Sequence, residues 1–277
     1  MLDRYATPYI CESLPQAAGY ALACGYIKIA GYAGTCFCAK QKMHHMFLRI
    51  KILMAMLCLA FAGHAAAGDA DTVVSYVVCD AGGDVYQLEG HAALRVRMPH
   101  ADVAVNYGLF DFGAPAFVWR FALGETDYMC GAAPWEYFLD SYTRTGRRVT
   151  EHRLNLTSEE KRRLLDFLSE NLRPENAVYR YNYVKDNCAT RPLRAIEIAM
   201  ADSILLPDPD GQQETFRSMM RRYHRNYPWY QFGIDLALGS GIDYRLSARE
   251  KSFAPVFLDD QLREARAASG RKLWTRP

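Results

Sequence analysis

Alternating hydrophobic and polar residues predict a sheet in the first part of the chain after residue 72. Residues 73–79 form a nearly continuous apolar run, which is typical of a buried strand. Residues 90–98 end in a strict alternation of apolar side chains with arginine, as a half-exposed strand does. A turn at 99–102 and renewed alternation over 103–107 predict an antiparallel return strand. A further strand is expected at 149–156.

Helical spacing dominates the later part of the chain. A short helix is expected at 134–142. Thr157 and Glu160 have the spacing of a capping box, and the helix that they open carries four leucines on one face before Pro174 ends it. Beyond residue 207 the pattern predicts helices with the bounds 216–223, 229–238 and 255–268. We expect these helices to pack on the same domain rather than to form another.

The composition is that of a globular protein and argues against a nucleic-acid partner. Half of the 277 residues are hydrophobic, 23% are charged, and the formal net charge is +2. Nucleic-acid-binding proteins carry a basic patch or block, which this sequence lacks. We also expect no cofactor and no bound metal.

Residues 43–67 are interpreted as a secretory signal peptide. They have a basic start, an apolar centre and small residues at the end, with Ala65 and Ala67 at the expected cleavage positions. The apolar run is about a dozen residues, shorter than the ~20 needed to span a bilayer. We therefore expect cleavage after Ala67 and a periplasmic location.

The segment 1–42 precedes the predicted signal peptide and is not expected to be a domain. A signal peptide normally stands at the start of a chain, so the simplest interpretation is a start codon assigned too early. The segment holds four cysteines, and the alternative is a small metal-binding or disulfide module. Their spacing matches no zinc pattern. The domain is then 68–277, which is large enough for one buried core.

Cys188 stands where a strand-like run changes into a helical one. Alternation through Val184 predicts a strand, and Asp186 and Asn187 are good capping residues. Pro192 is tolerated only near a helix start, so the helix cannot begin much before Asn187. A thiol at a helix N-terminus is favoured as thiolate, the nucleophilic form. The alternative is a small buried cysteine that caps a core helix.

His91 and Asn106 are the candidates to serve such a nucleophile. His91 opens the second predicted strand, and the return strand brings Asn106 back toward it, where an amide can orient an imidazole base. Asp102, nearer the turn, is the alternative orienting residue. Besides Cys188, the exported part contains Cys79 and Cys130, which are either bridged to each other or unpaired.

Several motifs, in one order, carry a resemblance to a known family. They are Gly90-His-Ala-Ala-Leu-Arg95, residues 106–112, residues 154–157, Tyr181-Asn-Tyr-Val-Lys-Asp-Asn-Cys188 with the three residues that follow, and residues 232–240. Together they resemble the N-terminal periplasmic domain of Lnb, the Bacteroides-type lipoprotein N-acyltransferase. The resemblance implies an α+β, circularly permuted papain-like (NlpC-type) domain, with an antiparallel sheet packed by helices and extra helices at the C-terminal end.

The same resemblance implies roles for the candidate residues. His91 matches the family histidine and Cys188 the family cysteine, while Asn106, or Asp102 in its place, is the third member. The implied activity moves an acyl chain from a phospholipid through an acyl-cysteine to a lipoprotein amine, with contact to a membrane surface. Three alternatives stay open: a lipase, a cell-wall peptidase of the same fold, and a lipid- or lipoprotein-binding module without turnover.

Overall fold

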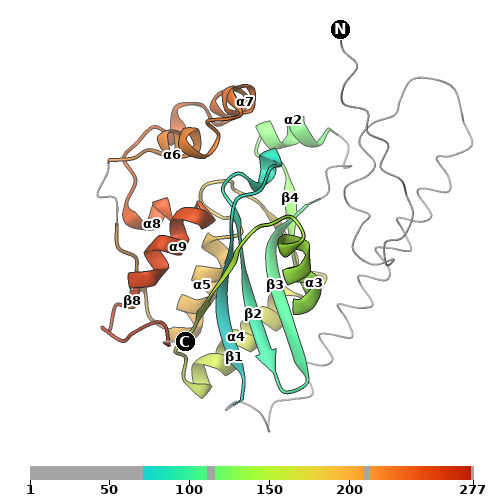
Figure 1. Cartoon of the computed structure of the whole chain (residues 1–277), viewed down its shortest axis with the longest axis vertical. Helices are drawn as coiled ribbons and strands as arrows, with labels where there is room; N and C mark the ends of the chain where they lie inside the picture. Colours follow the sequence, from blue (N-terminus) through green and yellow to red (C-terminus); the bar gives the residue numbers. More distant parts are fainter. Residues whose placement is uncertain (1–70, 111–115, 209–212, 276–277) are drawn as a thin grey trace, which may run out of the picture.

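The computed structural model describes residues 71–110, 116–208 and 213–275, and Figure 1 shows them in colour. The predicted leader and the signal peptide with its cleavage site lie outside these ranges. The main sheet has the strand order β5-β1-β2-β3-β4-β6, and every neighbouring pair is antiparallel. Its strands are β1 (Val73–Cys79), β2 (His91–Met98), β3 (Ala101–Leu109), β4 (Asp127–Pro134), β5 (Val149–Arg153) and β6 (Val178–Arg180). The predicted α+β class with an antiparallel sheet is therefore confirmed.

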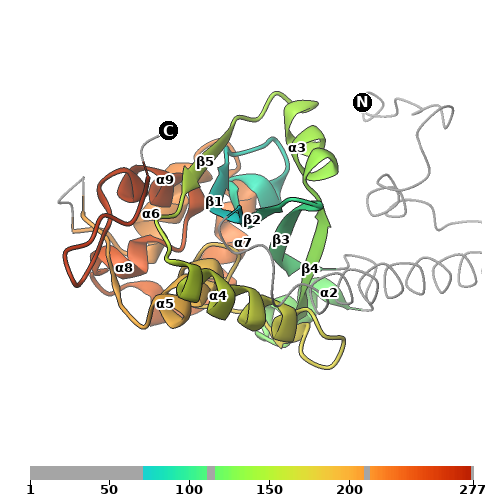
Figure 2. The ribbon, with the colours of Figure 1, turned by 90° about the horizontal axis from the view of Figure 1, so that it is seen from below.

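Strand alternation divides the sheet into two unequal faces, because successive side chains point to opposite sides. One face packs against α4 (Ser158–Asn171) and α5 (Thr190–Met200), which lie on the same side of the sheet in Figure 2. This is the main hydrophobic core. Its fully buried members include Tyr76, Leu94, Val105, Leu164, Leu168, Leu193 and Ile196.

The opposite face is covered by the shorter helix α3 (Trp135–Thr143). Here the strands present small residues, namely Cys79, Ala93 and Ala104, against Phe138 of α3. Small side chains on the strands allow the aromatic ring to approach the sheet closely. His91 shares this face, because it pairs with Cys79 in the β1–β2 register.

The predicted capping box at the start of α4 is present. The Thr157 hydroxyl accepts from the Glu160 backbone N–H at 3.2 Å, and the Glu160 carboxylate accepts from the Thr157 N–H at 2.8 Å. Glu160 also forms an ion pair with Arg271 at 2.7 Å. A local helix-start signal therefore also fastens the C-terminal end of the described chain.

The C-terminal helices pack on the same body, as expected. They are α6 (Phe216–Tyr223), α7 (Pro228–Leu238), α8 (Ala248–Lys251) and α9 (Pro255–Glu264), with η2 (Gly239–Ile242) between α7 and α8. They share a second hydrophobic cluster centred on Phe216, Phe253 and Phe257. The helix predicted over 255–268 ends early, because Arg266 and Ala267 form β8 (Arg266–Ala267) with β7 (Ile204–Leu205).

The structure adds a helix that was not predicted, and one predicted strand near Cys188 is shorter than expected. The additional helix is α2 (Phe117–Ala122), and its Trp119 is exposed. The strand expected to run through Val184 ends at Arg180, because Asn182 turns the chain by accepting from the backbone N–H groups of the two residues Val184 and Lys185.

Within 71–110, 116–208 and 213–275, none of the helices combines the length and hydropathy needed to cross a bilayer.

Candidate active site

The candidate residues gather at the end of the sheet where β1 ends and β2 begins. Gly90 directly precedes His91 and has a φ of +82°, a backbone conformation that other residues rarely adopt. A Cβ atom on Gly90 would lie 2.5 Å from the carbonyl oxygen of Cys79. Only glycine therefore allows the chain to enter β2 with His91 in this position.

His91 is held by Asn106, as the predicted return strand required. The distance between His91 Nε2 and Asn106 Oδ1 is 3.0 Å. An amide oxygen only accepts, so in the neutral ring the proton is on Nε2 and Nδ1 has a free lone pair. The Asn106 amide nitrogen faces the Ala104 carbonyl oxygen at 3.5 Å, which agrees with this orientation of the amide. The ring nitrogen that is not bound by Asn106 can act as a base.

The surroundings of His91 keep its ring uncharged. The ring stacks on Tyr142 of α3 with a centroid distance of 6.1 Å and an interplanar angle of 11°. The pKa of His91 is lowered to about 4, chiefly by burial and to a smaller extent by the positive charge of Arg147, against the raising effect of the Asn106 hydrogen bond. The Arg147 guanidinium lies over the Tyr142 ring at 4.5 Å. At neutral pH the imidazole is therefore available to take a proton.

Cys188 is placed by the residue before it. The buried Asn187 side chain accepts from the backbone N–H groups of Ala189 and Thr190 at 2.9 and 3.1 Å. The backbone carbonyl oxygen of Asn187 accepts from the Arg191 N–H at 3.2 Å. The turn that contains Cys188 is therefore already helical, although α5 itself begins at Thr190. This agrees with the helix start expected near Asn187. Asp186 does not cap the helix and instead pairs with Arg191 at 2.7 Å.

Cys188 packs against the end of β3 at Gly108. The β2–β3 register pairs Ala93 with Asn106, and Gly108 follows Asn106 by two residues near the end of β3. A Cβ atom on Gly108, which has a φ of +87°, would lie 3.5 Å from the Cβ of Cys188. The backbone N–H of Ala92, the residue after His91, faces the Cys188 sulfur and lowers its pKa. The nucleophile candidate thus lies beside the first residues of β2.

The protonation state of Cys188 differs from the sequence prediction. A helix N-terminus was expected to favour thiolate, but burial raises the pKa of Cys188 to about 11. The backbone N–H groups of Ala92, Cys188 and Ala189 oppose this effect, and the negative charge of Glu89 adds to it. Removal of the thiol from water outweighs the field of one helix end. At neutral pH the pair is a thiol and a neutral imidazole, so a base is needed to activate the sulfur.

Asp102 is not at this site. It forms a two-pronged ion pair with Arg95, with distances of 2.9 and 2.6 Å, and lies opposite Arg97 near the other end of β2. Asn106 is the residue that contacts His91.

Cys79 and Cys130 are unpaired and buried. They belong to β1 and β4, which β2 and β3 separate, and they face different hydrophobic clusters. Three strand spacings amount to about 14 Å, twice the distance between α carbons that a disulfide tolerates. The expected alternative of a bridge between them is therefore wrong.

A buried network joins the start of β2 to α7, and no local sequence pattern predicts it. Glu89 accepts from the Tyr183 hydroxyl at 2.6 Å and lies 3.3 Å from His224 Nε2. His224 Nδ1 contacts Gln231 Oε1 at 2.8 Å, so Nδ1 carries a proton, and Gln231 donates to Asp235 at 2.6 Å. Nε2 of His224 and Oε1 of Glu89 are both buried and form no other hydrogen bond. These partners are 135 residues apart, too far for any local pattern.

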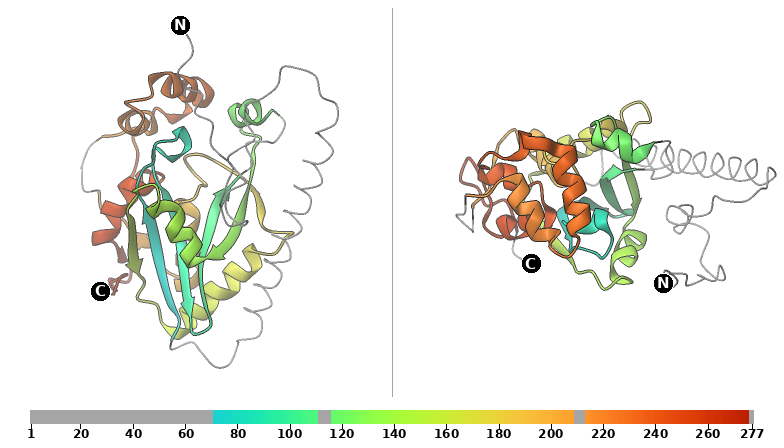
Figure 3. Two further views of the ribbon diagram at one scale, coloured as in Figure 1. Left: turned by 45° about the vertical axis from the view of Figure 1, so that its right-hand side comes forward. Right: turned by 90° about the horizontal axis from the view of Figure 1, so that it is seen from above.

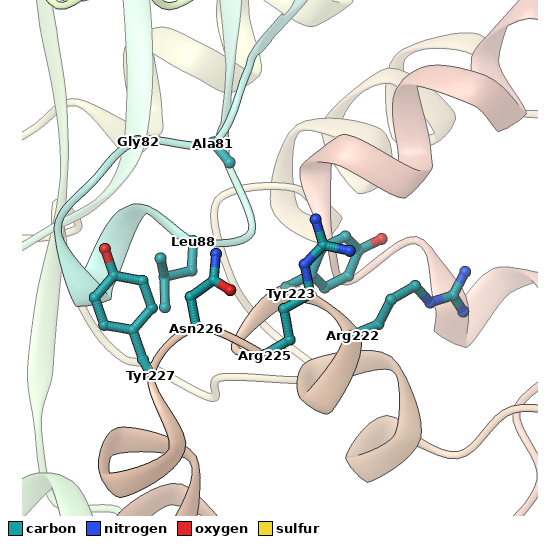
Figure 4. Close-up of a pocket in the computed structure, with 8 residues that line it drawn as sticks. All are labelled: Ala81, Gly82, Leu88, Arg222, Tyr223, Arg225, Asn226 and Tyr227. Atoms are coloured by element: carbon teal, nitrogen blue, oxygen red, sulfur yellow. The ribbon is translucent and has the colours of Figure 1, made fainter.

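A pocket of about 410 Å³ opens beside this network, between the segment that carries η1 (Val85–Gln87) and the α6–α7 turn (Figure 4). Arg225, Asn226 and Tyr227 contribute to its wall, and neither His91 nor Cys188 does. Tyr227 closes one side by donating to the Gly83 carbonyl oxygen at 2.7 Å. Among the described residues, no group of three histidine, cysteine or acidic side chains is arranged to hold a metal ion.

Comparison with known families gives one match. The model of the Lnb N-terminal periplasmic domain matches residues 60–222. The match contains His91, Asn106 and Cys188, whereas α7 and α9 lie beyond its end. No curated protein and no solved structure gives a significant match.

Proposed function

The chain belongs to the family of Lnb N-terminal periplasmic domains, and from this membership and the geometry around Cys188 we propose that it is an exported thiol acyltransferase. The family is periplasmic by description, in agreement with the predicted signal peptide. The proposed reaction moves an acyl chain from a phospholipid to the amine of a lipoprotein. The proposed fold is the circularly permuted papain-like one, in which the base precedes the nucleophile along the chain.

One observation carries the proposal: His91 is neutral, oriented and next to the residue whose amide faces the Cys188 sulfur. Its Nε2 is held at 3.0 Å by Asn106, which leaves Nδ1 as the basic nitrogen. The Ala92 amide faces the sulfur. A neutral thiol near a neutral, fixed imidazole is the arrangement that general-base activation of a nucleophile requires.

In the first half of the proposed reaction, Nδ1 of His91 takes the thiol proton as the Cys188 sulfur attacks the ester carbonyl carbon. A carbon–sulfur bond forms, and the bond from the carbonyl carbon to the glycerol oxygen breaks. The leaving oxygen takes the proton back from His91. The products are a lysophospholipid and an acyl-cysteine, and no charge is gained or lost.

In the second half, the amine nitrogen of the acceptor attacks the thioester carbonyl carbon. His91 takes a proton from the nitrogen, the carbon–sulfur bond breaks, and the proton passes to the sulfur. An amide is formed and the Cys188 thiol is restored. The amide is much more stable than the thioester, so transfer to an amine proceeds without an added energy source.

The backbone N–H groups around the sulfur supply the electrostatic part. Those of Ala92 and Cys188 both face the sulfur and lower its pKa, so they favour negative charge at this point. The oxygen of a tetrahedral intermediate on Cys188 develops its charge next to the same groups. Fixed donors of this kind typically contribute about 3 kcal/mol each to transition-state stabilisation.

The test separates acyl-enzyme formation from transfer. With phospholipid vesicles and no acceptor, mass spectrometry of the wild-type chain is expected to detect an acyl group on Cys188, and addition of a diacylated lipopeptide is expected to discharge it as an amide. Cys188→Ala and His91→Ala each should lose nearly all acylation, and Cys188→Ser should be poor because a hydroxyl ionises much less readily. Asp102→Asn is the matched control, since Asp102 pairs with Arg95 away from the site.

Other outcomes would assign other functions. Cleavage of a muropeptide without an acyl-cysteine from phospholipid would replace the acyltransferase by a cell-wall peptidase. If free fatty acid is released and the addition of an amine acceptor does not decrease its amount, the protein is a lipase. A binding module is indicated if the chain binds lipopeptide tightly, if Cys188→Ala leaves this affinity unchanged, and if no covalent product forms.

A further inference from the structure

The helix α7 exposes large apolar side chains on one face. Trp229, Phe232 and Leu236 are 85%, 61% and 75% exposed. Their spacing of three and four residues places them in one row along the helix. We call these three residues the α7 ridge. Surface helices normally turn polar residues to water, so an exposed row of this size indicates a binding surface.

The charges of α7 do not lie on the ridge. Between Pro228 and Leu238, Asp235 is the one ionisable side chain besides the phenol of Tyr230. Asp235 forms ion pairs with Arg217 at 2.6 Å and with Arg221 at 2.8 Å. The buried side of the helix is formed by Gln231 and Ile234. The row is therefore uncharged, while Arg217 and Arg221 of α6 contact the helix beside it through Asp235.

A second helix adds to the same end of the molecule. Trp119 and Leu123, at α2 and its C-cap, are 68% and 53% exposed. Phe121 of α2 and Leu238 of α7 pack against the same hydrophobic cluster. In Figure 1 and in the left view of Figure 3, α2 and α7 lie at the end of the sheet from which β2 starts.

The ridge is connected to the candidate active site. Gln231, on the buried side of α7, contacts His224 at 2.8 Å, and His224 lies 3.3 Å from Glu89, two residues before His91. Tyr227, at the N-cap of α7, donates to the carbonyl oxygen of Gly83. The helix is thus fastened by its polar side to the segment that leads into β2.

We propose that the α7 ridge, together with Trp119 and Leu123, docks the chain on the surface of a phospholipid bilayer. This rests on the proposed function, in which the acyl donor is a membrane lipid that must reach Cys188. Tryptophan, phenylalanine and leucine opposite a basic flank are the composition of helices that lie in the interface of an anionic membrane. With 11 residues, α7 is about 16 Å long, roughly half of a bilayer core, so it lies on the surface and does not span it.

The exposed charges favour a lipid surface over a protein partner. Arg221, beside the ridge, is 60% exposed although it pairs with Asp235, and Arg222 is 41% exposed although it pairs with Glu214. Cations at the edge of an apolar row match the headgroups above an acyl layer. Docking in this orientation turns the start of β2 and the neighbouring Cys188 toward the lipid.

The experiment measures binding to vesicles of phosphatidylethanolamine and phosphatidylglycerol. The full chain is used throughout, so any contribution of residues 1–70 is common to all variants, and Cys188→Ala is present to prevent turnover. Replacement of the three ridge residues by Ser is expected to weaken binding by on the order of 100-fold or more, since each buried side chain contributes roughly tenfold. The control replaces Ile198 and Leu205 by Ser, because these are also exposed, at 48% and 57%, but lie on α5 and β7.

A second readout locates the contact. Phospholipids with brominated acyl chains should quench the tryptophan emission of the wild-type chain, and Trp229→Phe should remove a large part of that quenching. Equal vesicle binding by the ridge variant and the control would overturn the proposal. So would a concentration-dependent dimer, seen by sedimentation and lost in the ridge variant, in a chain that binds no vesicles.

The outcome for docking is independent of the outcome for catalysis. If the ridge variant loses vesicle binding but the wild-type chain forms no acyl-cysteine, the acyltransferase assignment fails and the docking surface stands. If acyl-cysteine forms from lipid in detergent micelles while the ridge variant still binds vesicles normally, the docking surface fails and the acyltransferase stands. Circular dichroism of each variant checks that the fold is kept.

Discussion

The Nε2 atom of His91 lies 3.0 Å from the Oδ1 atom of Asn106. These residues are on neighbouring strands, and the carbonyl oxygen of the amide can only accept a hydrogen bond. The contact therefore fixes both the tautomer and the plane of the imidazole. It leaves Nδ1 of the neutral ring without a proton and able to act as a base.

Two substitutions of Asn106 should have opposite effects on the base. Asn106→Leu keeps the approximate size but removes the acceptor, so acylation of Cys188 should fall by at least roughly tenfold at every pH. Asn106→Asp keeps an acceptor and adds a negative charge, which should raise the pKa of His91 by about 1 or more. The acid limb of the pH–rate profile should move up accordingly in the aspartate variant. A purely structural role for Asn106 would leave that limb in place.

The pH dependence of activity and of stability should both report the low pKa of His91. Acylation should persist as pH falls through 6.5 and be lost only near pH 4, because the ring stays neutral until then. The unfolded chain binds this proton near pH 6.5 and the folded chain only near pH 4, so the free energy of unfolding should decrease as pH falls through this window. The full contribution is on the order of 3 kcal/mol.

The stability effect can be assigned with one variant. Urea unfolding of the wild-type chain and of His91→Gln should be compared at several pH values from 7 to about 4. The wild-type chain should lose more stability than the variant over this window. Equal losses would mean that His91 titrates normally.

Gly90 should be required for a geometric reason that another glycine does not share. An alanine at Gly90 would place its Cβ 2.5 Å from the Cys79 carbonyl oxygen, in addition to the strain of a φ of +82°. Gly124 has a φ of +68° with nothing within 4 Å of its added Cβ, so Gly124→Ala has the strain without the clash. We expect a loss of roughly 1–2 kcal/mol in Gly124→Ala and about 1–3 kcal/mol more in Gly90→Ala. Thermal unfolding checks both, and only Gly90→Ala should also lower the acylation rate.

Glu160 should contribute to stability through two separate contacts. It closes the capping box with Thr157 and pairs with Arg271 at 2.7 Å while 7% exposed. Glu160→Ala should cost about 2–3 kcal/mol of unfolding free energy, the sum of a lost cap and a partly buried ion pair. Glu159→Ala, one residue earlier and exposed, should leave the denaturation midpoint almost unchanged. Similar losses in the two variants would contradict the assigned role of Glu160.

The fold was largely readable from the sequence wherever the signal was local. The apolar run of β1, the alternation along β2 and β3, and the capping box of α4 depend on residues within a few positions of each other, and the structure confirms them. The capping residue Asn187 and the position of Pro192 likewise predict where α5 begins to within a few residues. The antiparallel return from β2 to β3 is enough to predict that Asn106 lies near His91, and the 3.0 Å contact confirms it.

What the sequence determined by itself was therefore most of the larger helices, the strands β1, β2 and β3 with His91 and Asn106 on two of them, and a cysteine at a helix start. Only the tertiary structure decided the protonation of that cysteine, because burial by distant segments outweighs the local field of the helix. It also decided that Asp102 pairs with Arg95, that Glu89 meets His224, and that the apolar row of α7 faces outward. Periodicity reports which residues share a side of an element, whereas burial and long-range pairing depend on what packs against that side.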